Sequence, residues 1–174
     1  MKYPPNIFVF LAGALIIVLV LSGCADIGES EPECTPNFTL YGKTLDNEDF
    51  DWESLRGKYV LVKFTATWCD PCKGTIPGLL EAYKKYHDKG LEIVSVYIWE
   101  EEPNAVATVK RFVEQEKLPW VILSESLTAK AGQPPQGDAF GIQGIPTIAL
   151  VDKEGKIIAL HDDYKQKLRE AFGE

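Results

Sequence analysis

Apolar and polar positions alternate along the chain in blocks that predict strands and helices in turn. A mostly apolar run at 59–64 is typical of a strand covered on both faces. Helical patterns follow at 77–89 and 104–116, and further β-rich runs lie at 91–99 and 120–123. This β-α-β-α-β alternation predicts parallel strands joined by right-handed crossovers, and so an α/β domain.

The two ends of this domain follow a different pattern. The remaining predicted elements are an opening hairpin from 38–40 and 49–51, a turn at 52–55, a Gly/Pro-rich loop at 132–137, a closing hairpin of strands 147–151 and 156–160, and a helix at 163–172. The closing hairpin adds antiparallel strands to a parallel arrangement. We therefore expect a mixed central sheet flanked by helices.

Three tryptophans and two acidic runs have simple structural interpretations. Trp52, Trp99 and Trp120 lie in apolar runs, so we expect them in the core. The runs 100–102 and 162–163 are acidic, and we expect them in solvated turns.

The first 23 residues have the layout of an export signal. Ile7–Leu21 has no charged residue and is followed by Ser22, Gly23 and Cys24. As a helix this segment would reach about 22 Å at about 1.5 Å per residue, which is short for a bilayer core of about 30 Å. Cleavage after the segment is therefore the preferred interpretation, and an uncleaved anchor helix with an unmodified Cys24 is the alternative.

The segment Leu21-Ser22-Gly23-Cys24 resembles the bacterial lipobox, in which the cysteine thiol receives a diacylglycerol before the signal is cut off just ahead of it. The resemblance implies that lipid on Cys24 holds the protein to the extracytoplasmic face of a membrane. Residues 25–36 are acidic and contain Pro and Gly, which predicts a tether. The expected parts are a lipoprotein signal peptide (1–23), a lipidated cysteine with its tether (24–36) and one domain (37–174).

Composition and charge exclude several classes of protein. The 174 residues are 45% hydrophobic and 25% charged, which is typical of a globular domain. The formal net charge is −8, so the basic surface that a nucleic-acid-binding protein needs is missing. An acidic domain also gains nothing from anionic lipid, so attachment to the membrane depends on the lipid or the apolar segment.

The segment Trp68-Cys69-Asp70-Pro71-Cys72-Lys73 carries the candidate chemistry, because it follows a buried strand and opens a helix. Two intervening residues let the thiols of Cys69 and Cys72 close a small disulfide, and the helix N-terminus favours the Cys69 thiolate. We expect Cys69 to attack a partner disulfide and the more enclosed Cys72 to resolve the mixed disulfide. Pro71 fits early in a helix, where its missing N–H costs nothing.

Other interpretations of the cysteines are weaker. A zinc site needs a second pair of ligands, and the only histidines, His87 and His161, are not spaced as a metal pair, so we expect no metal. A plain structural disulfide would not require the strand-to-helix setting or the neighbouring Trp68. Cys34 lies in the tether, where it is a bystander or forms an adventitious intermolecular bridge.

Residues 36–172 resemble the TlpA/ResA group of membrane-attached thioredoxin-like proteins. The resemblance is carried by Asn37-Phe38-Thr39-Leu40, Leu55-Arg56-Gly57-Lys58, the segment from Phe64 to Lys73, Ile76-Pro77, the segment from Phe140 to Thr147, and Asp152-Lys153-Glu154-Gly155-Lys156. It implies a thioredoxin-like fold with an N-terminal β-hairpin extension.

The resemblance also implies a substrate-binding surface. In that family the proline matching Pro146 follows a cis peptide bond and lies against the cysteines, and the residue matching Ile145 offers backbone hydrogen bonds to an extended substrate. Ile145 and Pro146 would then form a ledge for the substrate, while Trp68 and Pro71 add surface beside the reactive sulfur. Without the upstream cysteines, an ordinary turn before a strand would be the simpler interpretation of this segment.

Two positions depart from the family pattern. Thioredoxins usually have a buried Asp six residues before the first cysteine, and here that residue is Lys63; many TlpA-like proteins have a Glu three residues after the second cysteine, and here it is Thr75. If Lys63 points inward, burial lowers its pKa, and a neutral amine could take the proton of Cys72, whereas a charged one would favour thiolates. Alternatively Lys63 extends to solvent and water accepts the proton. Lys63 and Asp70 are thus candidate modulators of the cysteine pKa values.

Together these features predict an extracytoplasmic, lipid-anchored protein thiol–disulfide oxidoreductase that requires no cofactor. Ile145 before Pro146, as in reducing thioredoxins, and Asp70, which opposes an extreme drop in the Cys69 pKa, favour a reductant. Expected clients are apocytochromes with their haem-site cysteines or misoxidised exported proteins. A reductant in an oxidising compartment needs electrons, and we expect a membrane thiol carrier to supply them.

Two other functions remain as alternatives. A peroxidase of related fold would hold its cysteine in a Thr-x-x-Cys motif, but Ala66 stands at the threonine position before Cys69, so peroxide consumption should be negligible. A non-catalytic scaffold or copper-carrying lipoprotein would keep the fold, retain Cu(I) through its thiols and fail to reduce insulin.

Overall fold

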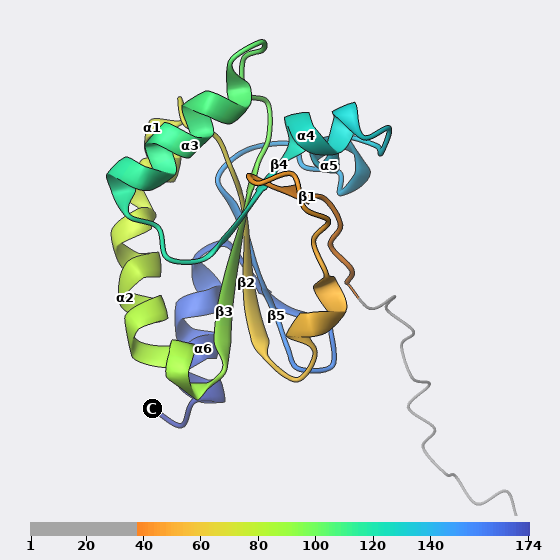
Figure 1. Ribbon diagram of the computed structural model, residues 1–174. Coiled ribbons are helices and arrows are strands. Elements are labelled where there is room, and N and C mark those ends of the chain that lie inside the picture. The colour runs from red at the N-terminus through yellow and green to blue at the C-terminus, as the bar shows by residue number, and fades with distance from the viewer. Residues whose placement is uncertain (1–37) are drawn as a thin grey trace, which may run out of the picture. The chain divides into compact units, whose positions relative to one another are not determined.

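The computed structural model describes residues 38–174, and six strands form one mixed sheet in it (Figure 1). In spatial order the strands are β1 (Lys43–Thr44), β4 (Val121–Ser124), β3 (Leu91–Tyr97), β2 (Tyr59–Thr65), β5 (Thr147–Val151) and β6 (Ile157–Leu160). The predicted signal segment, Cys24, Cys34 and the tether lie outside the described residues. The described residues form one compact unit.

The strand directions confirm the predicted mixed sheet. β2, β3 and β4 run parallel, which is the geometry expected of strands joined by helical crossovers. β5 runs antiparallel to β2, and β6 runs antiparallel to β5, as the closing hairpin predicts. β6 forms one edge of the sheet, and β1 forms the other.

The helices cover both faces of this sheet. They are α1 (Asp70–Gly74), α2 (Ile76–Tyr86), α3 (Ala105–Glu116), α4 (Glu125–Lys130), α5 (Gln136–Ala139) and α6 (Tyr164–Ala171), with short 3-10 helices η1 (Trp52–Leu55), η2 (His87–Lys89) and η3 (His161–Asp163). Gly90, with φ of 101°, ends η2 in the left-handed conformation that favours glycine. No helix within residues 38–174 is long and apolar enough to cross a bilayer.

Alternate residues of β2 pack into two separate hydrophobic cores, one on each face of the sheet. This explains why the sequence of β2 is nearly all apolar. Leu61 packs on the face covered by α2, α3 and α6, where Leu79, Val109 and Leu168 are buried. Val62 packs on the opposite face with Trp52 of η1. A strand covered on both faces has no polar side, so its pattern does not alternate.

The N-terminal hairpin and the segment after β4 differ from the sequence-based expectation. Residues 38–40 form no strand; β1 lies further along and pairs with β4, and the predicted hairpin is reduced to one bridge between Lys43 and Asp49. The short helices α4 and α5 were not predicted, and α5 begins inside the expected loop. Their position depends on tertiary contacts: the buried Gln136 donates a hydrogen bond to the Tyr41 carbonyl, which is 95 residues away in the sequence.

Candidate active site

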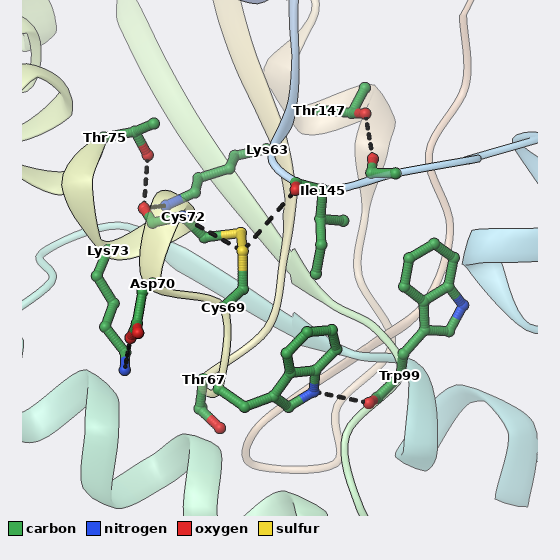
Figure 2. Close-up of a disulfide and its surroundings, with 12 residues drawn as sticks. Lys63, Thr67, Cys69, Asp70, Cys72, Lys73, Thr75, Trp99, Ile145 and Thr147 are labelled. Carbon is green, nitrogen blue, oxygen red and sulfur yellow. Dashed lines mark hydrogen bonds and ion pairs between the residues drawn. A yellow bond between two sulfur atoms is a disulfide. The ribbon is translucent and has the colours of Figure 1, made fainter.

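The two cysteines of the Cys-x-x-Cys segment form a disulfide at the point where β2 leads into α1 (Figure 2). Cys69 is the N-cap residue of α1, and the Cys72 amide donates a hydrogen bond to the Cys69 sulfur at 3.2 Å. Pro71 lies in the first turn, where a helix requires no N–H donor from it. The predicted strand-to-helix setting of the cysteines is confirmed.

The two sulfurs differ in their access to solvent. Cys69 is 5% exposed and Cys72 is 1% exposed, so Cys72 is the more enclosed residue, as the sequence predicts. Trp68, directly before Cys69, is 54% exposed. At this position Trp68 and, to a small extent, Cys69 are open to solvent, whereas Cys72 is enclosed.

Trp99 is not a core residue, which corrects the sequence-based expectation. It is 40% exposed, and its carbonyl oxygen accepts a hydrogen bond from the Trp68 indole N–H at 3.0 Å. β3 ends at Tyr97, and Trp99 follows with a φ of 56°, so the chain turns away from the sheet at this position. This hydrogen bond holds the two exposed tryptophans together beside the disulfide. The other two, Trp52 and Trp120, are buried as predicted.

Glu100 was expected in a solvated turn, but it is partly buried and contacts the loop before the cysteines. Its carboxylate accepts hydrogen bonds from both the backbone N–H and the hydroxyl of Thr67, the residue before Trp68. Burial raises the pKa of Glu100, although the two hydrogen bonds from Thr67 act in the opposite direction. Glu100 therefore fixes the loop that carries Trp68 and Cys69. The sequence contained no signal for this role, because the pairing joins residues 33 positions apart.

The loop before β5 lies against the disulfide. The peptide bond between Ile145 and Pro146 is cis, and the Ile145 carbonyl oxygen lies 3.8 Å from the Cys69 sulfur. Ile145 also packs against Ala66, Cys69 and Cys72 in a small apolar cluster. Residues that are 76 positions apart in the sequence are thus neighbours (Figure 2).

An apolar groove of about 560 Å³ extends from Ile145 and Pro146 to the edge strand β6. Its side-chain walls include Phe38, Phe64, Phe140, Ile142, Ile157 and Leu160. His161 is the only residue with an ionisable side chain in this lining. The surface beside the disulfide on this side is therefore suited to apolar groups.

Lys63 points into the protein, which excludes the alternative that it extends to solvent. It is 3% exposed, and its ammonium nitrogen donates a hydrogen bond to the Cys72 carbonyl at 3.0 Å (Figure 2). Burial lowers its pKa from 10.5 to about 8. No carboxylate within residues 38–174 lies at ion-pair distance from it.

Asp70, the other candidate modulator, and Thr75, the other departure from the family pattern, have simpler surroundings. Asp70 is exposed, and its ion pair with Lys73 at 2.8 Å lowers the pKa of the Asp70 carboxyl. The Thr75 hydroxyl donates to the Cys72 carbonyl at 2.8 Å. Neither residue places a carboxylate beneath the disulfide.

Comparison with known proteins agrees with this geometry. The family model described as Redoxin matches residues 30–172. Two relatives named thiol-disulfide oxidoreductase ResA are 32% identical. The match to ResA of Bacillus cereus (strain ZK / E33L) covers 71% of this chain and 64% of that protein, and the match to ResA of Bacillus thuringiensis (strain Al Hakam) covers 87% and 82%.

A solved structure gives the same result for the fold. The thioredoxin domain of a thiol-disulfide oxidoreductase from Bacteroides vulgatus is 28% identical, with a TM-score of 0.63, and the match covers 76% of this chain and 91% of that domain. The chain therefore belongs to the Redoxin family, as a thioredoxin-like thiol–disulfide oxidoreductase of the ResA type.

Proposed function

We propose that this protein reduces disulfides of exported client proteins at the extracytoplasmic face of a membrane, with Cys69 as the attacking sulfur and Cys72 as the resolving sulfur. The observation that carries the proposal is the asymmetry of the disulfide. Cys69 caps a helix beside an apolar ledge, while Cys72 is enclosed behind it. This arrangement suits a reaction in which one sulfur meets the client and the other releases it.

The reaction proceeds by two exchanges of sulfur. The Cys69 thiolate attacks one sulfur of the client disulfide, so that a mixed disulfide forms and the other client sulfur leaves as a thiolate. Cys72 then loses its proton and attacks the Cys69 sulfur. The second client sulfur leaves as a thiolate, and both client thiolates take up protons. Two protein thiols have then become a disulfide, and one client disulfide has become two thiols.

The client would lie along the ledge formed by Ile145 and Pro146. The Ile145 carbonyl lies beside the Cys69 sulfur, and the adjoining groove offers apolar walls for side chains that flank the client cysteine. Trp68, just before Cys69 in the sequence, and Pro71, two residues after it, would add apolar surface for the client. These four residues are the proposed substrate contacts.

The location rests on the sequence before residue 38. Its signal-like segment and Cys24 support export and lipid attachment, and a membrane thiol carrier is the proposed electron donor. Reduction is favoured over oxidation by Ile145 before Pro146, whereas the charge of Asp70 is paired with that of Lys73. Apocytochrome haem-site cysteines are proposed clients because a disulfide would block attachment of the haem.

The test is to trap the mixed disulfide with a Cys72→Ser variant in intact membranes. Without its resolving thiol, Cys69 should stay bonded to clients, and non-reducing gels followed by mass spectrometry should identify cysteine-bearing exported proteins. The matched control is the double variant Cys69→Ser/Cys72→Ser, which should trap none. If the single variant also traps none, and the wild type retains copper but does not reduce insulin, the scaffold alternative replaces the proposal.

A further inference from the structure

Lys63 is the only buried Lys, Arg, Asp, Glu or His in the part of the chain that the structure describes. It lies on β2, on the same face as Leu61, and its side chain reaches the end of the strand where α1 begins. Its register neighbours are Ser95 on β3 and Ile148 on β5. A buried ammonium thus lies within hydrogen-bond distance of the backbone of Cys72, one of the two disulfide cysteines.

Burial of the Lys63 ammonium destabilises the folded protein, and the hydrogen bonding of the ammonium offsets little of that cost. An ammonium in an apolar interior loses its hydration, and the lowered pKa of Lys63 reports that loss. The one hydrogen bond it makes is redundant, because the Cys72 carbonyl also accepts from the Thr75 hydroxyl at 2.8 Å and from the Thr75 amide at 3.2 Å. Costly ionisable groups of this kind concentrate at functional sites, since their charge acts on the chemistry there.

Among residues 38–174, Lys63 is the one charged side chain with a hydrogen bond to Cys72. Ser95, Ile148 and Thr75, which face Lys63 from β3, β5 and the end of α1, carry no charge. Asp70 and Lys73 neutralise each other in solvent. Glu100 is bound to Thr67 on the loop before the cysteines. The buried residues of α2 are Ile76, Leu79, Ala82 and Tyr86, and the Tyr86 hydroxyl donates to Glu174.

We propose that the Lys63 ammonium is a positioning charge that serves as the counter-ion of the Cys72 thiolate, and so stabilises the reduced form of the protein. The inference rests on the proposed function, since it concerns the same pair of cysteines. It assigns this site a positive charge, where the carboxylate of thioredoxins would act against a thiolate. Lys63 therefore makes the protein a weaker reductant than it would be with an uncharged residue at this position.

The Cys72 thiolate forms in both directions of the exchange. When a donor thiolate attacks Cys69, the bond between the two protein sulfurs breaks, and its electron pair goes to the Cys72 sulfur. When Cys72 releases a client, it must first lose its proton and then attack Cys69. In both steps the negative charge forms on a residue that is 1% exposed, where water cannot solvate it well. A positive charge already in place offsets that cost.

The test is the equilibrium of the full chain with glutathione buffers in the wild type and in Lys63→Met, which removes the charge but keeps the length of the side chain. A charge next to an ionising group shifts its pKa by about 1 to 3 units. At a pH at which Cys72 is ionised in the wild type, we therefore expect the equilibrium to shift toward the disulfide by at least about tenfold, which is about 30 mV for two electrons. The pH at which the cysteines ionise, followed by the absorbance of the thiolate, should rise in parallel.

Lys58→Met is the matched control, because Lys58 precedes the same strand but its side chain is 41% exposed and pairs with Glu92. We expect its equilibrium with glutathione to equal that of the wild type. Equal constants for the wild type and Lys63→Met, or an equal shift in Lys58→Met, would overturn the inference while leaving the proposed function intact. If the wild type does not exchange disulfides at all, the proposed function itself fails.

A measurement on the wild type covers the case in which Lys63→Met does not fold. Titration of isotope-labelled lysine side chains by NMR can follow Lys63 in both redox states. The Lys63 pKa should be higher in the reduced protein, because a thiolate then lies beside the ammonium. The same pKa in both states would contradict the inference.

Discussion

At Lys63 the needs of folding and of redox chemistry oppose each other. Its pKa in the folded protein is about 8, against the ordinary value of 10.5. Below pH 8 the lysine is charged in both the folded and the unfolded chain, and the folded protein bears the full cost of burying the charge. Between pH 8 and 10.5 only the folded state has lost the proton, so this cost disappears as the pH rises.

We therefore expect Lys63→Met to make the oxidised protein more stable at pH 7, by up to about 3 kcal/mol, since one pKa unit corresponds to about 1.36 kcal/mol. The gain over the wild type should fall through pH 8 to 10.5 and vanish above it. Urea denaturation under non-reducing conditions, repeated across this range, measures both free energies of unfolding. A gain that does not change with pH would show that packing, and not the charge, is responsible.

At the scale of elements, the contact between the N-terminal segment and α5 depends on Gly42. This residue has φ of 147°, and a Cβ atom built on it would overlap the side-chain nitrogen of the buried Gln136. That nitrogen donates the hydrogen bond to the Tyr41 carbonyl. A long-range contact between two short segments thus requires a glycine at this position.

The variant Gly42→Ala should lower the free energy of unfolding by about 3 kcal/mol, because it adds backbone strain and leaves a buried amide without its partner. Gly57→Ala is the matched control: its φ is 79°, but no atom lies within 4 Å of the added Cβ. Strain alone should cost it about 1 kcal/mol. Thermal or urea denaturation measures the free energy of unfolding of both variants. Equal losses of this free energy would mean that the contact with Gln136 contributes nothing.

At the scale of the whole molecule, the proposed attachment to a membrane depends on the N-terminal segment and not on the charge of the chain. The formal net charge is −8, so anionic lipid repels the protein as a whole. The described residues provide no helix that could span a bilayer. The lipid proposed on Cys24 would set where the oxidoreductase works.

In a bacterial host, we expect the mature protein to begin at Cys24 and to carry the mass of a lipid there. Cys24→Ala should abolish the modification and leave residues 1–23 attached, whereas Cys34→Ala, the matched control, should be processed normally. Mass spectrometry of the purified N-terminus distinguishes these outcomes. A wild-type protein that keeps residues 1–23 and an unmodified Cys24 would establish the anchor helix instead.

Local patterns were enough to predict the parts of the fold in which neighbouring residues decide the structure. The apolar run of β2, the helical spacing of α3 and the turn between β5 and β6 each appear in short windows of sequence. The short helices α4 and α5 did not, because a helix of this length is held by its contacts and not by its own propensity. Trp99 was misplaced for a similar reason, since an apolar neighbourhood does not reveal where the chain turns.

The sequence by itself determined that two cysteines separated by two residues follow a buried strand and begin a helix, because residues close together in the chain decide this. Only the tertiary structure decided what surrounds the disulfide between them. It brought Ile145 to Cys69 and Glu100 to Thr67, and it turned Lys63 inward beneath Cys72. These contacts join distant parts of the chain, and whether a lysine is solvated or buried depends on what packs over its strand.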